Sequence, residues 1–231
     1  MFDLHTHLLP GIDDGSSSLE ETIVLLKKAE SVGVTDVMFT SHYAKFRHYL
    51  PSKEKTKALF DEVLEKAKEE QINIQFHLGN EIDYDEELFQ YLEKDMTRTL
   101  GDSKYVLIDF GLKKYDVDDV IYELVVRGYK PIIAHPERYR YIHGVEDYKT
   151  WRKTGALLQV NASSLFAKHH AKKQFKLMLK HGLIDLVCSD VHRQTETYDH
   201  LLKTKEYMEK KCDKEYVQRV FEINPKKILK T

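Results

Sequence analysis

The chain has 231 residues, of which 42% are hydrophobic and 32% are charged, so it is long enough to bury a sizeable core in one domain spanning residues 1–231. Its 36 basic and 38 acidic residues leave a net charge of −2, which provides no general attraction to nucleic acid or to an anionic membrane. No apolar run approaches the roughly 18 residues that a membrane helix needs, and the two cysteines form no disulfide framework. These features predict a cytoplasmic protein without stable membrane insertion.

Short runs of β-branched and aromatic residues alternate with helical patterns along the chain. The expected strands are 2–5, 36–40, 72–78, 105–110, 131–134, 157–160 and 184–188. The first helix begins in the serine run 16–18, where Ser17 precedes Glu20 and Ser18 precedes Glu21 at capping-box spacing, and it stops at Gly33. Further helices are expected at 52–70, 116–127, 163–181, 195–212 and 214–229, the last with a break at Pro225.

This alternation of strand and helix predicts an α/β fold with parallel strands. The pattern alone leaves both a closed barrel and an open sheet possible. The polar residues suited to chemistry follow strand ends, and the active sites of βα barrels collect at the carboxyl ends of the strands. Their placement therefore favours the barrel.

The strongest single motif is His5-Thr6-His7 at the end of the first strand. Alternate residues of a strand point to the same face, so two imidazoles lie together and form half of a site for a metal such as Zn, Mn or Fe. The segments around Asp14, His42, Glu81, His135 and Asp190-Val191-His192 are weak individually, and Asp13-Asp14-Gly15 is most simply a turn. Because all of these segments follow predicted strands, together they are stronger candidates for a metal site than any one of them alone.

Five segments carry a family resemblance: HTHLLPGIDDG, TSH, GNEI, IAHPERYR and CSDVH. Together they resemble the motifs of the polymerase-and-histidinol-phosphatase (PHP) superfamily and, more narrowly, of its bacterial capsule-locus protein-tyrosine phosphatases. The likeness extends over essentially the whole chain, including LGDSKYVLIDF and NPKKIL. The resemblance implies a distorted (βα)7 barrel, the PHP fold, with three metal ions, which are Mn by preference or else Fe, Zn or Mg.

The resemblance also implies roles for particular residues. The metal ligands would be His5, His7, Asp14, His42, Glu81, Asp109, His135, Asp190 and His192, and Arg138 would bind phosphate. Two positions depart from the family pattern. The family usually has Glu where this chain has Asp109, and it tends to carry a second arginine a few residues after the D-x-H motif, where this chain reads Arg193-Gln194-Thr195-Glu196-Thr197.

Such a ligand set suits phosphate-ester hydrolysis. Three divalent ions bring six positive charges and the four carboxylates of the set cancel four, which leaves a cationic pocket for a phosphate dianion. We expect in-line attack by a metal-bound hydroxide, with Arg138 binding the phosphate and Asp190 or a histidine supplying a proton to the leaving oxygen. A cysteine phosphatase would need C-x5-R, but Gln194 and Gln218 stand six residues after Cys188 and Cys212.

Several functions remain open from sequence. The first is a protein-tyrosine phosphatase whose partner is a phosphotyrosine-containing protein, such as a tyrosine kinase of polysaccharide biosynthesis. The second is a small-molecule phosphomonoesterase such as histidinol-phosphate phosphatase, and the third is an inactive, metal-stabilised regulatory module. A nuclease is disfavoured because no basic groove is evident. Near His42, the residues Tyr43, Phe46, Tyr49 and Leu50-Pro51 form either an aromatic rim for the substrate ring or the start of a surface helix.

Overall fold

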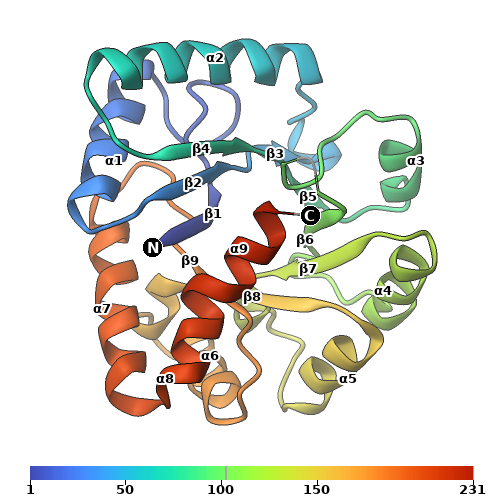
Figure 1. The fold of residues 1–231 in the computed structure, drawn as a ribbon. Coiled ribbons are helices and arrows are strands. Elements are labelled where there is room, and N and C mark those ends of the chain that lie inside the picture. The colour runs from blue at the N-terminus through green and yellow to red at the C-terminus, as the bar shows by residue number, and fades with distance from the viewer. Residues whose placement is uncertain (102, 231) are drawn as a thin grey trace.

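The computed structural model describes residues 1–101 and 103–230. Parallel strands cross its centre and helices surround them (Figure 1). The strands are β1 (Phe2–Thr6), β2 (Asp36–Phe39), β3 (His42–Tyr43), β4 (Gln75–Leu78), β5 (Glu81–Asp83), β6 (Tyr105–Asp109), β7 (Lys130–Ala134), β8 (Leu157–Asn161) and β9 (Leu186–Cys188). The α-helices are α1 (Leu19–Ser31), α2 (Lys53–Glu69), α3 (Leu88–Glu93), α4 (Val117–Val126), α5 (Glu146–Thr154), α6 (His170–Lys180), α7 (Glu196–Lys211), α8 (Lys214–Gln218) and α9 (Asn224–Leu229). Within the described ranges no helix is both long and apolar enough to cross a membrane.

The strands occupy seven positions around a distorted barrel. Two sheets run in the orders β1-β2-β4 and β3-β5-β6-β7-β8-β9, and every pairing is parallel. The pairs β2/β3 and β4/β5 are each one interrupted strand, because backbone bonds from Gly79 N to Phe39 O and from Glu81 N to Thr40 O continue the pairing across the gaps. Two backbone bonds join the carboxyl ends of β1 and β9: Asp190 N donates to His5 O at 3.0 Å, and His7 N donates to Val191 O at 2.9 Å. The predicted α/β barrel is confirmed.

The barrel interior is apolar towards the amino ends of the strands and polar at their carboxyl ends. Residues of alternate positions share a face of a strand, and the inward positions of β9 and the turn after it read Leu186, Cys188 and then Asp190. The inward apolar side chains form one buried cluster, which Ile228 of α9 completes. Figure 1 shows α9 in front of the strands, close to the amino-terminus.

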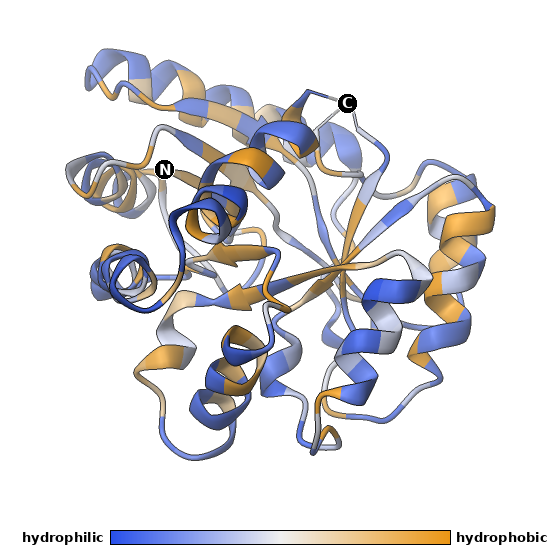
Figure 2. Ribbon diagram, turned by 60° about the horizontal axis from the view of Figure 1, so that its bottom comes forward, coloured by the Kyte–Doolittle hydropathy of each residue, from blue (hydrophilic) through white to orange (hydrophobic). Residues whose placement is uncertain are grey.

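The outward face of the strands supplies the larger core. Val37, Ile108, Ile133, Leu158 and Val187 are buried against the inner faces of the surrounding helices. Figure 2 shows the consequence, with hydrophobic strands at the centre and helices that are hydrophilic on much of their outer surface. Because β2, β6 and β7 are largely buried on both faces, they read as nearly continuous apolar runs, as parallel strands do.

Several predicted elements need correction. The strands β3 and β5 and the helices α3 and α5 were not predicted. The helix expected at 163–181 is divided into a 3-10 turn, Ala162–Leu165, and α6, because His169 before α6 has a positive φ of 58°. The expected break at Pro225 is absent, because the π-helical turn Arg219–Ile223 continues α8 into α9 and places the proline, which lacks an N–H group, in the first turn of α9.

The structure shows which of the two predicted serines caps α1. Ser18 is the N-cap, and its hydroxyl accepts a hydrogen bond from Glu21 N at 3.2 Å. The Glu21 carboxylate reaches back to Ser17, where it accepts from the backbone N–H at 2.6 Å. The Ser18/Glu21 spacing therefore forms the cap, while Ser17 is a partner of the same glutamate.

Candidate metal centre

Both histidines of the first motif lie at the centre of the polar end of the barrel. His5 and His7 are fully buried, and their Nε2 atoms are 3.2 Å apart. The Nδ1 atom of His5 lies 3.0 Å from Gln159 Oε1, and that of His7 lies 2.9 Å from Asp13 Oδ2. Nδ1 of each ring faces an acceptor, and a ring with its proton on Nδ1 would leave Nε2 free to bind a metal ion, as in histidine metal ligands.

Glu81 lies between four imidazoles. Its Oε1 is 2.9 Å from His135 Nε2 and 3.4 Å from His5 Nε2, and its Oε2 is 3.1 Å from His42 Nδ1 and 3.4 Å from His7 Nε2. Burial would raise the pKa of Glu81, but the facing histidines hold it well below the usual range. An ionised carboxylate that faces imidazoles with both of its oxygens is suited to binding cations on either side.

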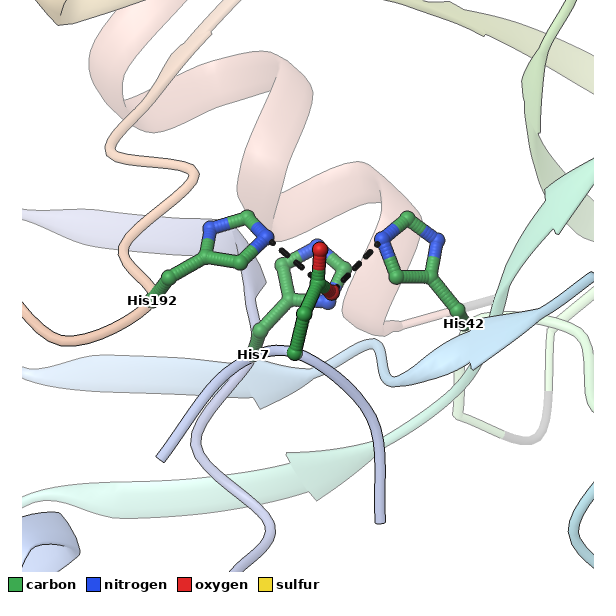
Figure 3. Close-up of side chains that lie close together, drawn as sticks. His7, His42 and His192 are labelled. Atoms are coloured by element: carbon green, nitrogen blue, oxygen red, sulfur yellow. Dashed lines mark ion pairs between the residues drawn. The ribbon is translucent and has the colours of Figure 1, made fainter. Parts of the chain in front are cut away.

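The outer part of the centre contains three histidines and one carboxylate. Figure 3 shows the rings of His7, His42 and His192 gathered around one point. Asp14 Oδ1 lies 3.4 Å from His42 Nε2 and 3.6 Å from His192 Nε2. Burial opposes protonation of His42, but the carboxylates around it raise its pKa to about 9, so this part of the centre favours positive charge.

Asp190 follows β9 in a left-handed conformation, with φ of 53°. Its Oδ1 is 3.4 Å from the Nε2 atoms of both His5 and His7, and its Oδ2 accepts from Asn161 Nδ2 at 2.6 Å. Burial alone would raise the pKa of Asp190, but these histidines hold it well below the usual range. An ionised carboxylate that faces two imidazoles suits the predicted ligand role of Asp190.

Asp109 and His135 lie beside Glu81, and these three residues are here called the inner part of the centre. Asp109 Oδ1 is 3.8 Å from His135 Nδ1, and both residues offer a ligand atom within 4.8 Å of one on Glu81. Burial would lower the pKa of His135, but Asp109 and Glu81 raise it to about 9. The shorter side chain at position 109 therefore still reaches the centre.

The structure brings all nine predicted ligands into groups whose donor atoms lie within 4.8 Å of one another. These groups are His7/Asp14/His42/His192, His5/His7/Glu81, His5/His135/Asp190, His42/Glu81/Asp83 and Glu81/Asp109/His135. Glu81 Oε2, Asp83 Oδ1 and His135 Nδ1 are buried and have no hydrogen-bond partner in the protein. Buried polar atoms normally have hydrogen-bond partners. These three atoms have none, and they belong to imidazoles and carboxylates, the side chains that bind divalent metal ions.

Four residues of the centre escaped the sequence reasoning. Asp13, taken as part of a turn, orients His7, and its Oδ2 also accepts from His42 N at 2.9 Å. Asp83 joins a candidate group. Gln159 and Asn161 lie on β8 and contact His5 and Asp190. The signal for the two amides was their alternation with apolar residues at the end of a strand, which places them on the inward face.

Two arginines near the centre have different roles. Arg138 Nη1 lies 3.2 Å from Asp190 Oδ2, and the side chain is 52% exposed, so part of its guanidinium is open to a ligand. Arg193 Nε donates to the Gly15 carbonyl oxygen at 2.7 Å. Arg193 therefore fastens the 13–15 turn.

Gly15 is required by close packing at this turn. A Cβ built at Gly15 would lie 2.0 Å from the His7 carbonyl oxygen, which is far inside van der Waals contact. The turn thus brings Asp13 and Asp14 against the end of β1, where Asp13 reaches the ring of His7.

Cys188 is buried inside the barrel below Asp190. Burial raises the pKa of its thiol well above the usual range, so the thiolate is disfavoured. This agrees with a packing role.

A family model described as "Capsular polysaccharide synthesis, CpsB/CapC" matches residues 1–230. The chain belongs to the CpsB/CapC family. Among curated relatives, a putative tyrosine-protein phosphatase CapC of Staphylococcus aureus is 32% identical over 200 residues, covering 84% of this chain and 78% of the relative. The tyrosine-protein phosphatase CpsB of Streptococcus pneumoniae is 29% identical over 239 residues, covering 99% of this chain and 98% of the relative.

Solved structures agree with the CpsB/CapC assignment. A crystal structure from work on YwqE of Bacillus subtilis and CpsB of Streptococcus pneumoniae, described as metal-dependent tyrosine phosphatases, matches with a TM-score of 0.91 and 27% identity over 99% of this chain and 94% of that one. A histidinol phosphate phosphatase of Lactococcus lactis, complexed with zinc, matches with a TM-score of 0.52 and 13% identity over 90% of this chain and 95% of that one. The second likeness is one of fold alone.

Proposed function

We propose that this protein is a metal-dependent tyrosine phosphatase, working as a single domain over residues 1–231. The observation that carries the proposal is the buried cluster of five imidazoles with carboxylates, in a chain that resembles structures described as metal-dependent tyrosine phosphatases at a TM-score of 0.91. The curated relatives named as tyrosine-protein phosphatases support the same reaction.

The nine predicted ligands would hold three divalent ions, with Mn preferred and Fe, Zn or Mg as alternatives. Bound ions of this kind lower the pKa of water from 15.7 to about 7 and so make hydroxide available near neutral pH. Glu81, between His5, His7, His42 and His135, would hold ions in the inner part together with these histidines. Asp14, His42 and His192 would hold the outer part.

Arg138 would bind the phosphate group. Its planar fork matches the phosphate oxygens, and its contact with Asp190 Oδ2 at 3.2 Å places it at the edge of the centre. Asp190 in turn is fixed by Asn161. Charge developing on the phosphoryl oxygens would thus meet a guanidinium already oriented by the protein.

The relatives named tyrosine-protein phosphatases support a phosphotyrosine-containing protein as the substrate, and the family description supports a role in capsular polysaccharide synthesis. We propose that this substrate is a bacterial tyrosine kinase of polysaccharide biosynthesis, and that the phosphatase acts in the cytoplasm. The chain's net charge of −2 gives no support to a nucleic-acid partner.

Rates on three substrates test the proposal. The Mn-loaded protein, with its bound metal measured, is assayed on a phosphotyrosine peptide, histidinol phosphate and single-stranded DNA. The expected result is preferential hydrolysis of the peptide, abolished by a chelator and restored by Mn. Preferential hydrolysis of histidinol phosphate would replace the proposal with a small-molecule phosphatase, and no hydrolysis by a folded, metal-loaded protein would indicate a regulatory module.

A further inference from the structure

The segment after β3 brings a second guanidinium to the centre. Arg47 Nη1 lies 2.8 Å from His42 Nε2, and Arg47 Nη2 donates to Asp14 Oδ2. Its guanidinium carbon is 5.2 Å from the centre of the Tyr49 ring, which itself stacks on His42 at 5.9 Å and 13°. Arg47 therefore turns back over the outer part of the centre.

The backbone fixes the loop that carries Arg47. Ala44 and Tyr49 exchange two backbone hydrogen bonds of 2.7 and 3.0 Å, which close residues 45–48 into a short loop, here called the tip loop. Lys45 ties the start of the loop to Glu87 at 2.5 Å, and His48 ends it with φ of 61°. The direction of Arg47 is thus set by pairing on both sides of the loop.

Arg47 and Arg138 approach the centre through different carboxylates. Arg47 contacts Asp14 and Arg138 contacts Asp190, and both carboxylates lie within 3.7 Å of a ring nitrogen of His192. The side chains of Arg47 and Arg138 are 37% and 52% exposed, so part of each fork is open. A phosphate dianion between them would accept charged hydrogen bonds from both.

The tip loop also supplies a second arginine that the sequence pattern did not place. Arg193 is held by the Gly15 carbonyl oxygen at 2.7 Å, whereas Arg47 already faces the site. Cations held by His42 and Asp14 would use the same lone pairs that Arg47 contacts, so its N–H groups would be available to an anion.

The residue before Arg47 in the tip loop, Phe46, offers an exposed apolar surface. Phe46 is 78% exposed, although large apolar side chains gain most from burial. Tyr43, by contrast, is buried against Tyr91 with ring centroids 5.0 Å apart, so it belongs to the core and not to a substrate rim.

We propose that the tip loop recognises the phosphoaryl group of the substrate: Arg47 binds the phosphate together with Arg138, and Phe46 packs against the aromatic ring. This inference rests on the proposed phosphatase function, because it assigns parts of that substrate to named residues. The sequence left an aromatic rim and a surface helix start as alternatives. The structure forms an exposed 3-10 turn at Lys45–Arg47 and buries Tyr43, and we assign the ring contact to Phe46 of that turn.

Binding of inorganic phosphate tests the role of Arg47 without turnover. Mn-loaded wild type, Arg47→Ala and Arg47→Lys are compared by calorimetry after their metal content is measured. Arg127→Ala is the matched control, because Arg127, directly after α4, also contacts two carboxylates, Glu93 of α3 and Glu123 of α4. We expect full metal content in all variants. Phosphate affinity should fall about tenfold or more in Arg47→Ala, as expected for the loss of a charged hydrogen bond, with partial recovery in Arg47→Lys and no change in the control.

Two outcomes overturn the role of Arg47. One is a phosphate affinity within twofold of wild type in Arg47→Ala. The other is loss of metal from Arg47→Ala, which would mean that Arg47 acts on assembly of the centre. If wild type hydrolyses no phosphotyrosine peptide, the proposed function fails, while phosphate calorimetry still decides the role of Arg47.

Phe46→Ala tests the ring contact separately. We expect KM for a phosphotyrosine peptide to rise about three- to tenfold, in the range of an aromatic contact, with unchanged phosphate affinity. Tyr122→Ala removes another exposed aromatic side chain, 62% exposed on α4, and should change neither value. An unchanged KM in Phe46→Ala would overturn the ring contact.

Discussion

Replacing Gln159 with leucine tests whether buried amides hold the metal ligands in place. Gln159 is 1% exposed, and its Oε1 accepts from His5 Nδ1 at 3.0 Å and from His135 N at 3.2 Å. Its Nε2 donates to Asn161 Oδ1 at 2.9 Å, and Asn161 donates to Asp190. Gln159 therefore contacts two predicted ligands, His5 and His135, directly, and a third, Asp190, through Asn161.

The size of the effect follows from these contacts. Leucine has a similar volume but no acceptor, so two buried donors, His5 Nδ1 and His135 N, lose their partner. An unpaired buried donor costs about 1–3 kcal/mol, so two of them predict a loss of about 2–6 kcal/mol in the free energy of unfolding. Loss of a partner that orients histidine ligands costs about 10- to 100-fold in metal affinity.

Metal affinity by chelator competition and stability by urea unfolding measure the two effects. Gln174→Leu is the control, because Gln174 is 2% exposed and bonds to Ile142 O at 3.2 Å and Tyr148 at 3.3 Å rather than to a predicted ligand. The control should lose stability and keep its metal affinity. The positioning role of Gln159 is refuted if both variants lose metal affinity equally, or if Gln159→Leu binds metal as wild type does.

Three further substitutions test other parts of the site. Arg138→Ala should keep its metal and lose about 100-fold or more in kcat/KM, as for loss of a transition-state donor; a loss below tenfold, with metal analysis alongside kinetics, would exclude the phosphate-binding role. Cys188→Ser should retain activity, because burial disfavours the thiolate, and an inactive variant with intact fold and metal would contradict the hydroxide mechanism. Gly15→Ala should lower the melting temperature and the metal content, because its Cβ would lie 2.0 Å from the His7 carbonyl oxygen. Gly144→Ala is the control and should be nearly neutral, because a Cβ there meets no atom within 4 Å. Equal effects of the two substitutions would refute the packing argument.

The sequence located the centre because a parallel barrel converts distant segments into neighbours. His5, Glu81, Asp109, His135 and Asp190 lie at or just beyond strand ends, and parallel strands end at one face. Strand position could therefore be predicted from local patterns, and the meeting of the side chains followed from the topology.

The partners of the ligands could not be predicted in the same way. Asp13 reads locally as a turn residue, and only the fold shows that it contacts His7 and the backbone of His42, 29 residues away. Arg47 lies in a loop whose direction depends on the pairing of Ala44 with Tyr49. Contacts of this kind depend on where a loop lies over the barrel, which no local pattern specifies.

The missed elements have a related cause. β3 has two residues and β5 has three, too few to show a period of two. α5 buries only Tyr148 and Trp151 among its nine residues, so its apolar stripe is too short to stand out in a charged segment. In both cases tertiary packing, rather than local pattern, decides the structure.

The departure at Asp109 shows how backbone placement can offset a shorter side chain. Tyr139 is buried, and its hydroxyl donates to Ala134 O at 2.9 Å and accepts from Phe110 N at 2.9 Å. This hydroxyl joins the end of β6 to the end of β7, immediately beside Asp109 and His135. Asp109 Oδ1 also accepts from Gly111 N at 2.7 Å, which fixes the carboxylate itself. Whether residue 109 reaches the centre therefore depends on the position of the two strand ends as much as on the length of its side chain.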